Sequence, residues 1–268
     1  MLMKNVKYYA GLFDADGSFD MWPTKREDGS YYINIKATLY QKNTVVFNEL
    51  VDEYGVEVKE GNDCSYITLH GTKAEMFMRA VKNYLVIKRE VVEYLLSIKG
   101  ETVDDISEIR KKIQEARSKR SSEKDWPSRR WMAGYIDGDG CLLSSYRKSD
   151  GNLEFKLSVV SHYSQMQGLE LMQKAFGGSI VEQQDCRRWN LSLSVTKGKQ
   201  VLNHFANHLK VKKEQAALIL DCLMTGKHFR KRGASKEMNY QIHQQLQELK
   251  LPATTKSENV SNDDVIVC

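Results

Sequence analysis

The sequence lacks long apolar runs and has few cysteines, and each shortage excludes a class of protein. No stretch of the 268 residues approaches the roughly 18 apolar residues that a membrane-spanning helix requires, and the first five residues lack the apolar core of a signal peptide. The five cysteines show no CxxC or metal-type spacing, and their odd number argues against a disulfide framework. We therefore expect a soluble intracellular protein.

A large excess of charge of one sign is also missing. Lysine and arginine number 40 against 35 aspartates and glutamates, which leaves a formal net charge of +5. So modest an excess permits nucleic-acid binding without establishing it. The length suits two compact units of about 110 residues each, large enough for cores of their own.

One ten-residue pattern occurs twice. Residues 8–17 read YYAGLFDADG and residues 131–140 read WMAGYIDGDG, so that Asp16 corresponds to Asp139. A pattern repeated after nearly half the chain indicates two copies of one domain. The Ala-Gly pair in each copy leaves one stripe of a helix bare, where another backbone can approach closely. We expect the two helices to pack against each other.

Each run ends at a glycine, which we expect to adopt the left-handed conformation that terminates a helix. The last carboxylates before these glycines, Asp16 and Asp139, then lie side by side at the helix ends. Two like charges this close repel each other unless cations lie between them. The pair is therefore a candidate metal site.

The two runs, read as residues 9–17 and 132–140, resemble the signature of the LAGLIDADG homing endonucleases, and the resemblance covers roughly residues 5–222. It implies an α+β fold of two pseudo-twofold related αββαββα halves, with the signature helices at their interface and antiparallel sheets that form a DNA-binding saddle. It also implies that Asp16 and Asp139 are metal ligands sharing two or three Mg²⁺ ions. For Asp14 and Asp137 we expect hydrogen bonds near the helix ends that shape the turn.

After each signature the hydrophobic period changes from helical to alternating. Apolar residues at 33, 35, 37 and 39, and again at 153, 155, 157 and 159, define a predicted core face of a sheet. The opposite face carries polar, cationic and aromatic side chains suited to base edges and phosphates, although an ordinary solvated face is the alternative. The candidate DNA contacts are Asp20, Trp22, Thr24, Tyr32, Asn34, Lys36, Thr38, Ser145, Arg147, Glu154, Lys156 and Ser158, with Arg187 and Arg188 beside a later hairpin turn.

Helices and hairpins are predicted to follow in the same order in both copies. Helices are expected at residues 44–54 and 167–176, each stopped by glycine. Hairpins are expected to pair residues 56–59 with 66–70 and residues 179–182 with 190–195.

A lysine before a later helix is a further feature that both copies share. Lys88 and Lys212 each follow an apolar pair, and the family resemblance places them near the scissile phosphates, where a lysine can neutralise developing charge or orient the attacking water. A lysine with no catalytic task is the alternative. The resemblance also implies that Gln41 holds water or metal. The second half has Ser161 there, followed by His162, with Gln165 the nearest amide, so we expect unequal active sites and a conceivable nicking bias.

We divide the chain into a first half at 1–114, a linker at 115–130, a second half at 131–224, a basic helical extension at 225–250 and a disordered tail at 251–268. The linker is rich in serine and charge, and Pro127 blocks helix continuation. The basic run at 227–236 is a candidate for backbone contacts beside the DNA site. Two fused halves in one monomer can read an asymmetric target, whereas a homodimer needs a near-palindrome.

The resemblance implies a Mg²⁺-dependent homing endonuclease that cuts a long, asymmetric duplex site, leaves short 3′ overhangs and needs no covalent nucleophile. The second hypothesis is an RNA-binding maturase that assists its host intron, with or without cleavage, although the retained signature carboxylates favour cleavage. A DNA-binding regulator is less favoured because no separate helix-turn-helix segment is present. We expect the protein in bacterial or archaeal cytoplasm or in a chloroplast or mitochondrion.

Overall fold

The computed structural model describes residues 3–119, 127–162, 166–183, 186–225 and 236–250. The first half contains α1 (Val6–Ala15), β1 (Gly17–Lys25), β2 (Tyr31–Gln41), η1 (Thr44–Phe47), α2 (Asn48–Tyr54), β3 (Lys59–Glu60), β4 (Ser65–His70), α3 (Gly71–Val81), η2 (Lys82–Tyr84), α4 (Arg89–Ile98), β5 (Thr102–Val103) and α5 (Ser107–Ser118).

The second half repeats this order. It contains α6 (Arg129–Asp139), β6 (Gly140–Arg147), β7 (Asn152–His162), α7 (Gln167–Phe176), β8 (Ser179–Gln183), β9 (Cys186–Ser192), α8 (Val195–Phe205), η4 (Ala206–His208), α9 (Lys213–Thr225) and α10 (Lys236–Glu248). Both halves therefore follow the αββαββα succession, and the α+β class that the family resemblance implies is confirmed.

Each half has its own antiparallel sheet, and the two sheets share one strand order. The first runs β1-β2-β4-β3, with β5 added to β2, and the second runs β6-β7-β9-β8. Gly17 pairs with Leu39 in the first sheet and Gly140 pairs with Val159 in the second. Each of these pairs is the first one between the two opening strands of its sheet, so Leu39 is equivalent to Val159. Two residues further along the strand, Gln41 is therefore equivalent to Ser161.

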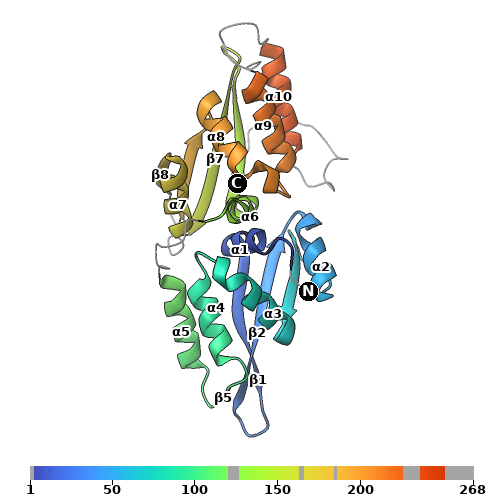
Figure 1. The fold of residues 1–268 in the computed structure, drawn as a ribbon, viewed down its shortest axis with the longest axis vertical. Coiled ribbons are helices and arrows are strands. Elements are labelled where there is room, and N and C mark those ends of the chain that lie inside the picture. Colours follow the sequence, from blue (N-terminus) through green and yellow to red (C-terminus); the bar gives the residue numbers. More distant parts are fainter. Residues whose placement is uncertain (1–2, 120–126, 163–165, 184–185, 226–235, 251–268) are drawn as a thin grey trace.

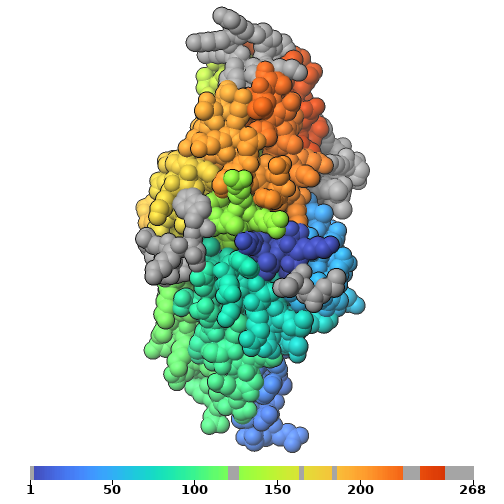
Figure 2. Space-filling model, in the orientation of Figure 1, coloured from blue at the N-terminus to red at the C-terminus, as the bar shows by residue number. Residues whose placement is uncertain are grey.

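The two halves meet along the paired helices α1 and α6 (Figure 1). The space-filling view shows an elongated molecule with the dark blue α1 and the yellow-green α6 in contact at its middle (Figure 2). The alternating residues predicted to face the core are buried in both sheets, including Ile33, Ile35, Leu157 and Val159, each with 0% exposure. The sheets thus pack their apolar faces against helices and turn the opposite faces outward.

Several local predictions were wrong. The residues before Lys59 do not join β3, and Val195 begins α8 instead of ending a strand. The segment 44–54 divides into a 3₁₀ turn, η1, and the helix α2. These differences lie at element ends, where one or two hydrogen bonds decide the assignment.

The prediction of left-handed glycines after the signatures was also wrong. Gly140 has φ −83° and ψ 153°, and Gly17 is likewise absent from the glycines with positive φ. Both glycines begin strands directly, and the tight change from helix to strand leaves no room for a side chain. A Cβ on Gly17 would lie 2.3 Å from the Phe13 ring, and one on Gly140 would lie 2.5 Å from the Ile136 carbonyl oxygen.

The last described helix, α10, packs on β6 and β7. Asn239 donates a 2.8 Å hydrogen bond to the Gly151 carbonyl, and the Tyr240 ring lies 5.4 Å from that of Tyr146. Of the predicted basic run, only Lys236 falls among the described residues, and the predicted tail lies outside them, as do linker residues 120–126. No helix in the described ranges is both long and apolar enough to cross a bilayer.

Candidate metal and nucleic-acid site

The helices α1 and α6 approach so closely that two glycines touch the opposite backbone. A Cβ on Gly11 would lie 1.9 Å from the Trp131 carbonyl oxygen, and one on Gly134 would lie 2.0 Å from that of Tyr8. Such distances are far below any carbon–oxygen contact, so only glycine fits at these two points. The close packing expected from the small residues is therefore present, and it is reciprocal.

Two buried aspartates, one in each signature, tie the halves together. Asp14 accepts hydrogen bonds from the Trp131 indole N–H of the other helix, at 2.8 Å, and from the backbone N–H groups of Val86 and Lys88, at 2.7 and 2.8 Å. Burial raises the pKa of Asp14, while these donors and the Lys88 charge oppose the rise. Asp137, the equivalent aspartate of the second half, also links a segment of its own half to the opposite helix.

Asp137 accepts a 2.7 Å hydrogen bond from the Tyr8 hydroxyl across the interface. It also accepts from the backbone N–H groups of Lys210, Val211 and Lys212, at 2.7, 3.1 and 2.9 Å. The expected hydrogen bonding is present, but it extends well beyond the turn. Each carboxylate fixes the segment that carries its own half's lysine and anchors it to the opposite helix.

The two lysines point their ammonium groups at the ends of the signature helices. The Lys88 ammonium donates to the carbonyl oxygens of Phe13, Ala15 and Gly17, at 2.8, 3.0 and 2.7 Å, and the Lys212 ammonium donates to that of Asp137 at 2.6 Å. Carbonyls at a helix end lack partners inside the helix and attract cations. Burial lowers the pKa of both lysines, and the nearby carboxylates oppose that fall.

Asp16 and Asp139 share the region beyond these helix ends. A Cβ on Gly138, next to Asp139, would lie 3.0 Å from Asp16 Oδ2, so the glycine leaves space for the opposite carboxylate. Burial, followed by the charge of Asp16, raises the pKa of Asp139 to about 7. Burial likewise raises the pKa of Asp16, against the charges of Lys212 and Lys88 and a hydrogen bond from the Gln41 amide. The two carboxylates therefore repel each other in a confined space.

The donor chemistry of this pair fits a hard divalent cation. Within the part of the chain that the structure describes, no group of three or more His, Cys, Asp or Glu side chains could hold a metal. The Asp16–Asp139 pair would therefore bind a cation together with oxygens from water or a phosphate, the arrangement typical of Mg²⁺. A cation between the carboxylates would also remove their mutual repulsion.

Comparison with known proteins agrees with this geometry. Residues 132–221 match the family model described as LAGLIDADG endonuclease. I-AabMI bound to uncleaved DNA aligns at a TM-score of 0.66 and 13% identity, over 89% of this chain and 98% of that one. I-GzeII in complex with its DNA target aligns at a TM-score of 0.67 and 14% identity, over 94% of this chain and 99% of that one. The resemblance to the LAGLIDADG endonucleases is confirmed.

A third LAGLIDADG structure, I-SmaMI bound to cleaved DNA, aligns at a TM-score of 0.65 and 14% identity, over 92% of this chain and 98% of that one. At these identities the likeness to the solved structures is one of fold. No curated protein sequence matches the chain. The matched family segment includes Asp139 and Lys212, and the first half places Asp16 and Lys88 in the equivalent positions.

The two halves of this LAGLIDADG fold differ beside their carboxylates. Gln41 reaches Asp16 in the first half, whereas its equivalent, Ser161, is a shorter buried side chain, and Gln165 lies outside the described residues. The second half instead has Tyr135, whose ring stacks on that of Trp131 with 4.9 Å between the ring centroids. Burial, followed by the charge of Asp139, raises the pKa of Tyr135 well above its ordinary value. The surroundings of the two carboxylates are thus unequal.

Most of the predicted DNA contacts in the first sheet lie on its outward face. Asp20, Tyr32, Asn34 and Lys36 are half-buried, while Trp22 and Thr24 are exposed. Thr38 is the exception, because it is buried and its hydroxyl is hydrogen-bonded to that of Thr68 at 3.2 Å. The strand neighbours therefore leave six of the seven side chains accessible.

The second sheet presents fewer free groups. Ser145, Arg147, Glu154 and Lys156 are exposed. Ser158 is buried, and its hydroxyl donates a 3.0 Å hydrogen bond to the side-chain oxygen of Asn190. Arg147 pairs with Asp150 and Glu154 at 3.2 and 3.5 Å, Arg187 pairs with Glu182 at 2.6 Å, and Arg188 is half-buried. These ion pairs offset part of the positive charge that Arg147 and Arg187 offer to DNA.

Sequence reasoning missed three contacts. The Trp22 ring lies 4.3 Å from that of His70, and Tyr40 lies 5.4 Å from Tyr66, so aromatic pairs cross the outward face. The strand alternation identifies these residues as outward-facing, but only the register pairs them. The Lys210 ammonium also reaches Glu49 of the other half at 2.8 Å, a contact that no sequence pattern indicates.

Proposed function

We propose that the protein is a site-specific homing endonuclease that makes a staggered double-strand break in a long, asymmetric DNA target by Mg²⁺-dependent hydrolysis. The observation that carries this proposal is the convergence of Asp16 and Asp139, one from each signature helix, beside two half-buried lysines. A carboxylate pair in which burial raises both pKa values is a common property of functional sites.

In this proposal Asp16 and Asp139 hold the divalent cations between the two halves. When bound by these carboxylates, divalent cations would supply the positive charge needed to activate a water and to stabilise the leaving oxygen. Gln41 orients Asp16 through its amide, and the half-buried Lys88 and Lys212 supply fixed positive charge at the helix ends. Positive charge held in place before the reaction stabilises the negative charge that develops on the phosphate.

The outward sheet faces are the proposed DNA-reading surface. They lie on strands that start at the signature glycines, so their side chains continue outward from the carboxylate pair along both halves. Charged and amide side chains such as Asn34 and Lys36 suit base edges and phosphates. Because the two halves carry different side chains, a monomer would read an asymmetric site.

The proposal is tested by selecting cleaved sites from a randomised duplex library with Mg²⁺, and bound sites in parallel with Ca²⁺. We expect one long asymmetric sequence to be recovered in both arms and to be cut only with Mg²⁺. Binding without cutting in any divalent cation would contradict the nuclease, and selection from intron RNA would then test the maturase alternative. No enrichment in either DNA arm would reject DNA recognition altogether.

A further inference from the structure

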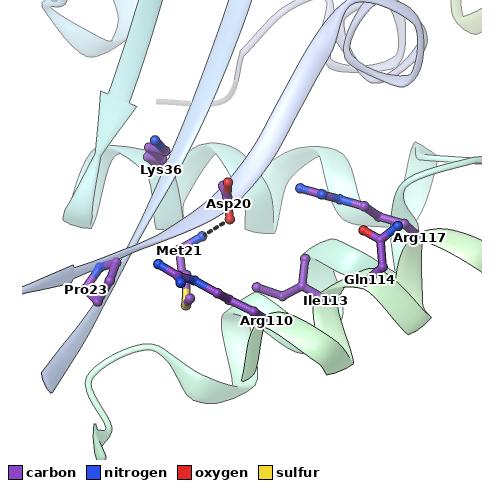
Figure 3. A pocket seen from close by; sticks show the side chains of 8 residues that line it. All are labelled: Asp20, Met21, Pro23, Lys36, Arg110, Ile113, Gln114 and Arg117. Atoms are coloured by element: carbon purple, nitrogen blue, oxygen red, sulfur yellow. Dashed lines mark hydrogen bonds between the residues drawn. The ribbon is translucent and has the colours of Figure 1, made fainter. Parts of the chain in front are cut away.

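A cationic groove lies between the edge strand β1 and the helix α5 in the first half. The cavity has a volume of about 440 Å³. It is lined by Asp20, Met21 and Lys36 from the sheet and by Arg110, Ile113 and Arg117 from the helix. Figure 3 shows Arg110 and Arg117 extending from α5 towards β1 on either side of Ile113. Neither the metal site nor the predicted base contacts account for these arginines.

The groove follows from the way α5 packs. The helix buries Ile109, Ile113 and Ala116. Arg110, Gln114 and Arg117 recur at helical spacing along the adjacent stripe, so they form one row beside the buried face. Because β1 is the edge of its sheet, this row faces the strand without another strand between them.

The cations of the groove have no ion pairs with other described side chains. None of Lys36, Arg110 and Arg117 takes part in a salt bridge in the described ranges, in contrast with Arg147 and Arg187 of the second half. Asp20 is the one carboxylate among the lining residues, and it accepts a 2.8 Å hydrogen bond from the Met21 backbone N–H. The groove therefore carries a local excess of positive charge suited to an anion.

One end of the groove lies near the catalytic region. Arg117 is close enough to Lys88 for its charge to oppose the protonation of that lysine, and Lys88 in turn interacts with Asp139 and Asp16. Arg110 lies seven residues earlier on α5, about 10 Å away along the axis at 1.5 Å per residue. The row of cations therefore leads away from the proposed cleavage site.

We propose that this groove binds the sugar-phosphate backbone of one DNA strand, with Lys36, Arg110 and Arg117 contacting its phosphates. This inference rests on the proposed function. The separation of about 10 Å exceeds the 3.4 Å rise between successive nucleotides of one strand, so the two arginines contact different phosphates. Guanidinium groups are well suited to this task because they bind phosphate oxygens in a bidentate manner.

A helix covers the corresponding edge of the second sheet. In the second half α10 packs on β6, where Ser144 is hydrogen-bonded to His243 at 2.8 Å and Tyr146 contacts Tyr240. Ser144 and Tyr146 occupy the register positions of Met21 and Pro23, which border the groove in the first half. Backbone contacts of this kind therefore hold one strand more firmly than the other.

The test compares a double variant, Arg110→Ala with Arg117→Ala, with a control double variant, Lys111→Ala with Lys112→Ala. The control removes the same charge from exposed positions of the same helix that do not line the groove. Binding of the selected duplex is measured in Ca²⁺ as a function of salt. Each lost phosphate contact lowers the slope of log affinity against log salt by about 0.9.

The groove variant is expected to lose about 1.8 from this slope, so that raising the salt from about 50 to 200 mM weakens its binding about tenfold less than it weakens wild-type binding. The control keeps the wild-type slope. Methylphosphonate substitution of single phosphates then locates the contacts, because neutralising a contacted phosphate weakens wild type but not the groove variant. The sensitive phosphates should lie on one strand.

Equal slopes for the groove and control variants would refute binding of the DNA backbone in the groove. The proposed nuclease function would still stand, provided that wild type binds and cuts the duplex. The same proposal would be refuted if methylphosphonate substitution at the sensitive positions weakened DNA binding by the groove variant and by the control variant equally. Failure of wild type to bind any duplex would reject both the backbone-binding role of the groove and the proposed function.

Discussion

The stability of the protein should depend on pH through Asp139. Its pKa of about 7 in the folded state lies far above the ordinary value of 3.8. Between these two values the folded state holds a proton that the unfolded state has released, so the contribution of this group to stability falls as pH rises through that window. A difference of about three pKa units corresponds to at most about 4 kcal/mol.

This loss can be measured by comparing wild type with Asp139→Asn in a chelator. The asparagine cannot ionise, so the variant should equal wild type near pH 4 and exceed its stability near pH 8 by up to about 4 kcal/mol, or roughly 10 °C in Tm. Thermal unfolding at several pH values gives the comparison. The exposed Asp63→Asn substitution is the control, and its difference from wild type should not change with pH.

A divalent metal ion should restore the folding stability that is lost at higher pH, and it should do so in wild type but not in Asp139→Asn. Ca²⁺ at about 100 times its Kd stabilises a protein by about 2.7 kcal/mol, and here the effect should increase from pH 6 to pH 8 because the proton competes for the carboxylate. Equal stabilisation of wild type and Asp139→Asn by Ca²⁺ would refute a metal site at this pair. A stability difference between them that does not change with pH would refute the raised pKa of Asp139.

Three further predictions concern cleavage and the interface. Asp16→Asn and Asp139→Asn should each abolish double-strand cleavage while largely sparing DNA binding, and full activity in either variant would contradict the assigned ligands. Lys88→Ala and Lys212→Ala should slow single-turnover cleavage more than they weaken binding, whereas equal losses would make the lysines simple phosphate contacts. Gly11→Ala should destabilise the protein by about 3 kcal/mol or more in urea unfolding, because its Cβ meets backbone. Gly198→Ala, which meets the movable end of the Leu223 side chain, should cost much less, and equal effects would contradict the role of the close helix contact.

The fold could be predicted because its signals are local. Helical and strand periods are visible within short stretches, and the repeated signature doubles each signal. The core positions of β2 and β7 therefore needed no tertiary information. The predicted left-handed Gly17 was wrong because a glycine after a helix is compatible with both a cap and a tight turn into a strand. Only the packing against Phe13 distinguishes them.

The candidate site was less accessible to sequence reasoning because it depends on how the two halves meet. The spacing pairs Asp16 with Asp139, but it does not indicate that Trp131 donates to Asp14 while Tyr8 donates to Asp137. Those contacts depend on the crossing of α1 and α6. The groove beside α5 is likewise a tertiary feature, since Arg117 and Asp20 are far apart in the chain.

The reciprocal side-chain and backbone contacts of the molecule lie where the two halves depend on each other. Asp14 and Asp137 make reciprocal bonds across the helix pair, and Gly11 and Gly134 make reciprocal backbone contacts, since a change in either would move both carboxylates. Other contacts between the halves are not reciprocal: Lys210 reaches Glu49, whereas its equivalent, Val86, is apolar. A single chain can keep a symmetric centre for two strand cuts and still acquire different surfaces on each side. Unequal strand preferences are thus expected to arise from residues around the carboxylate pair.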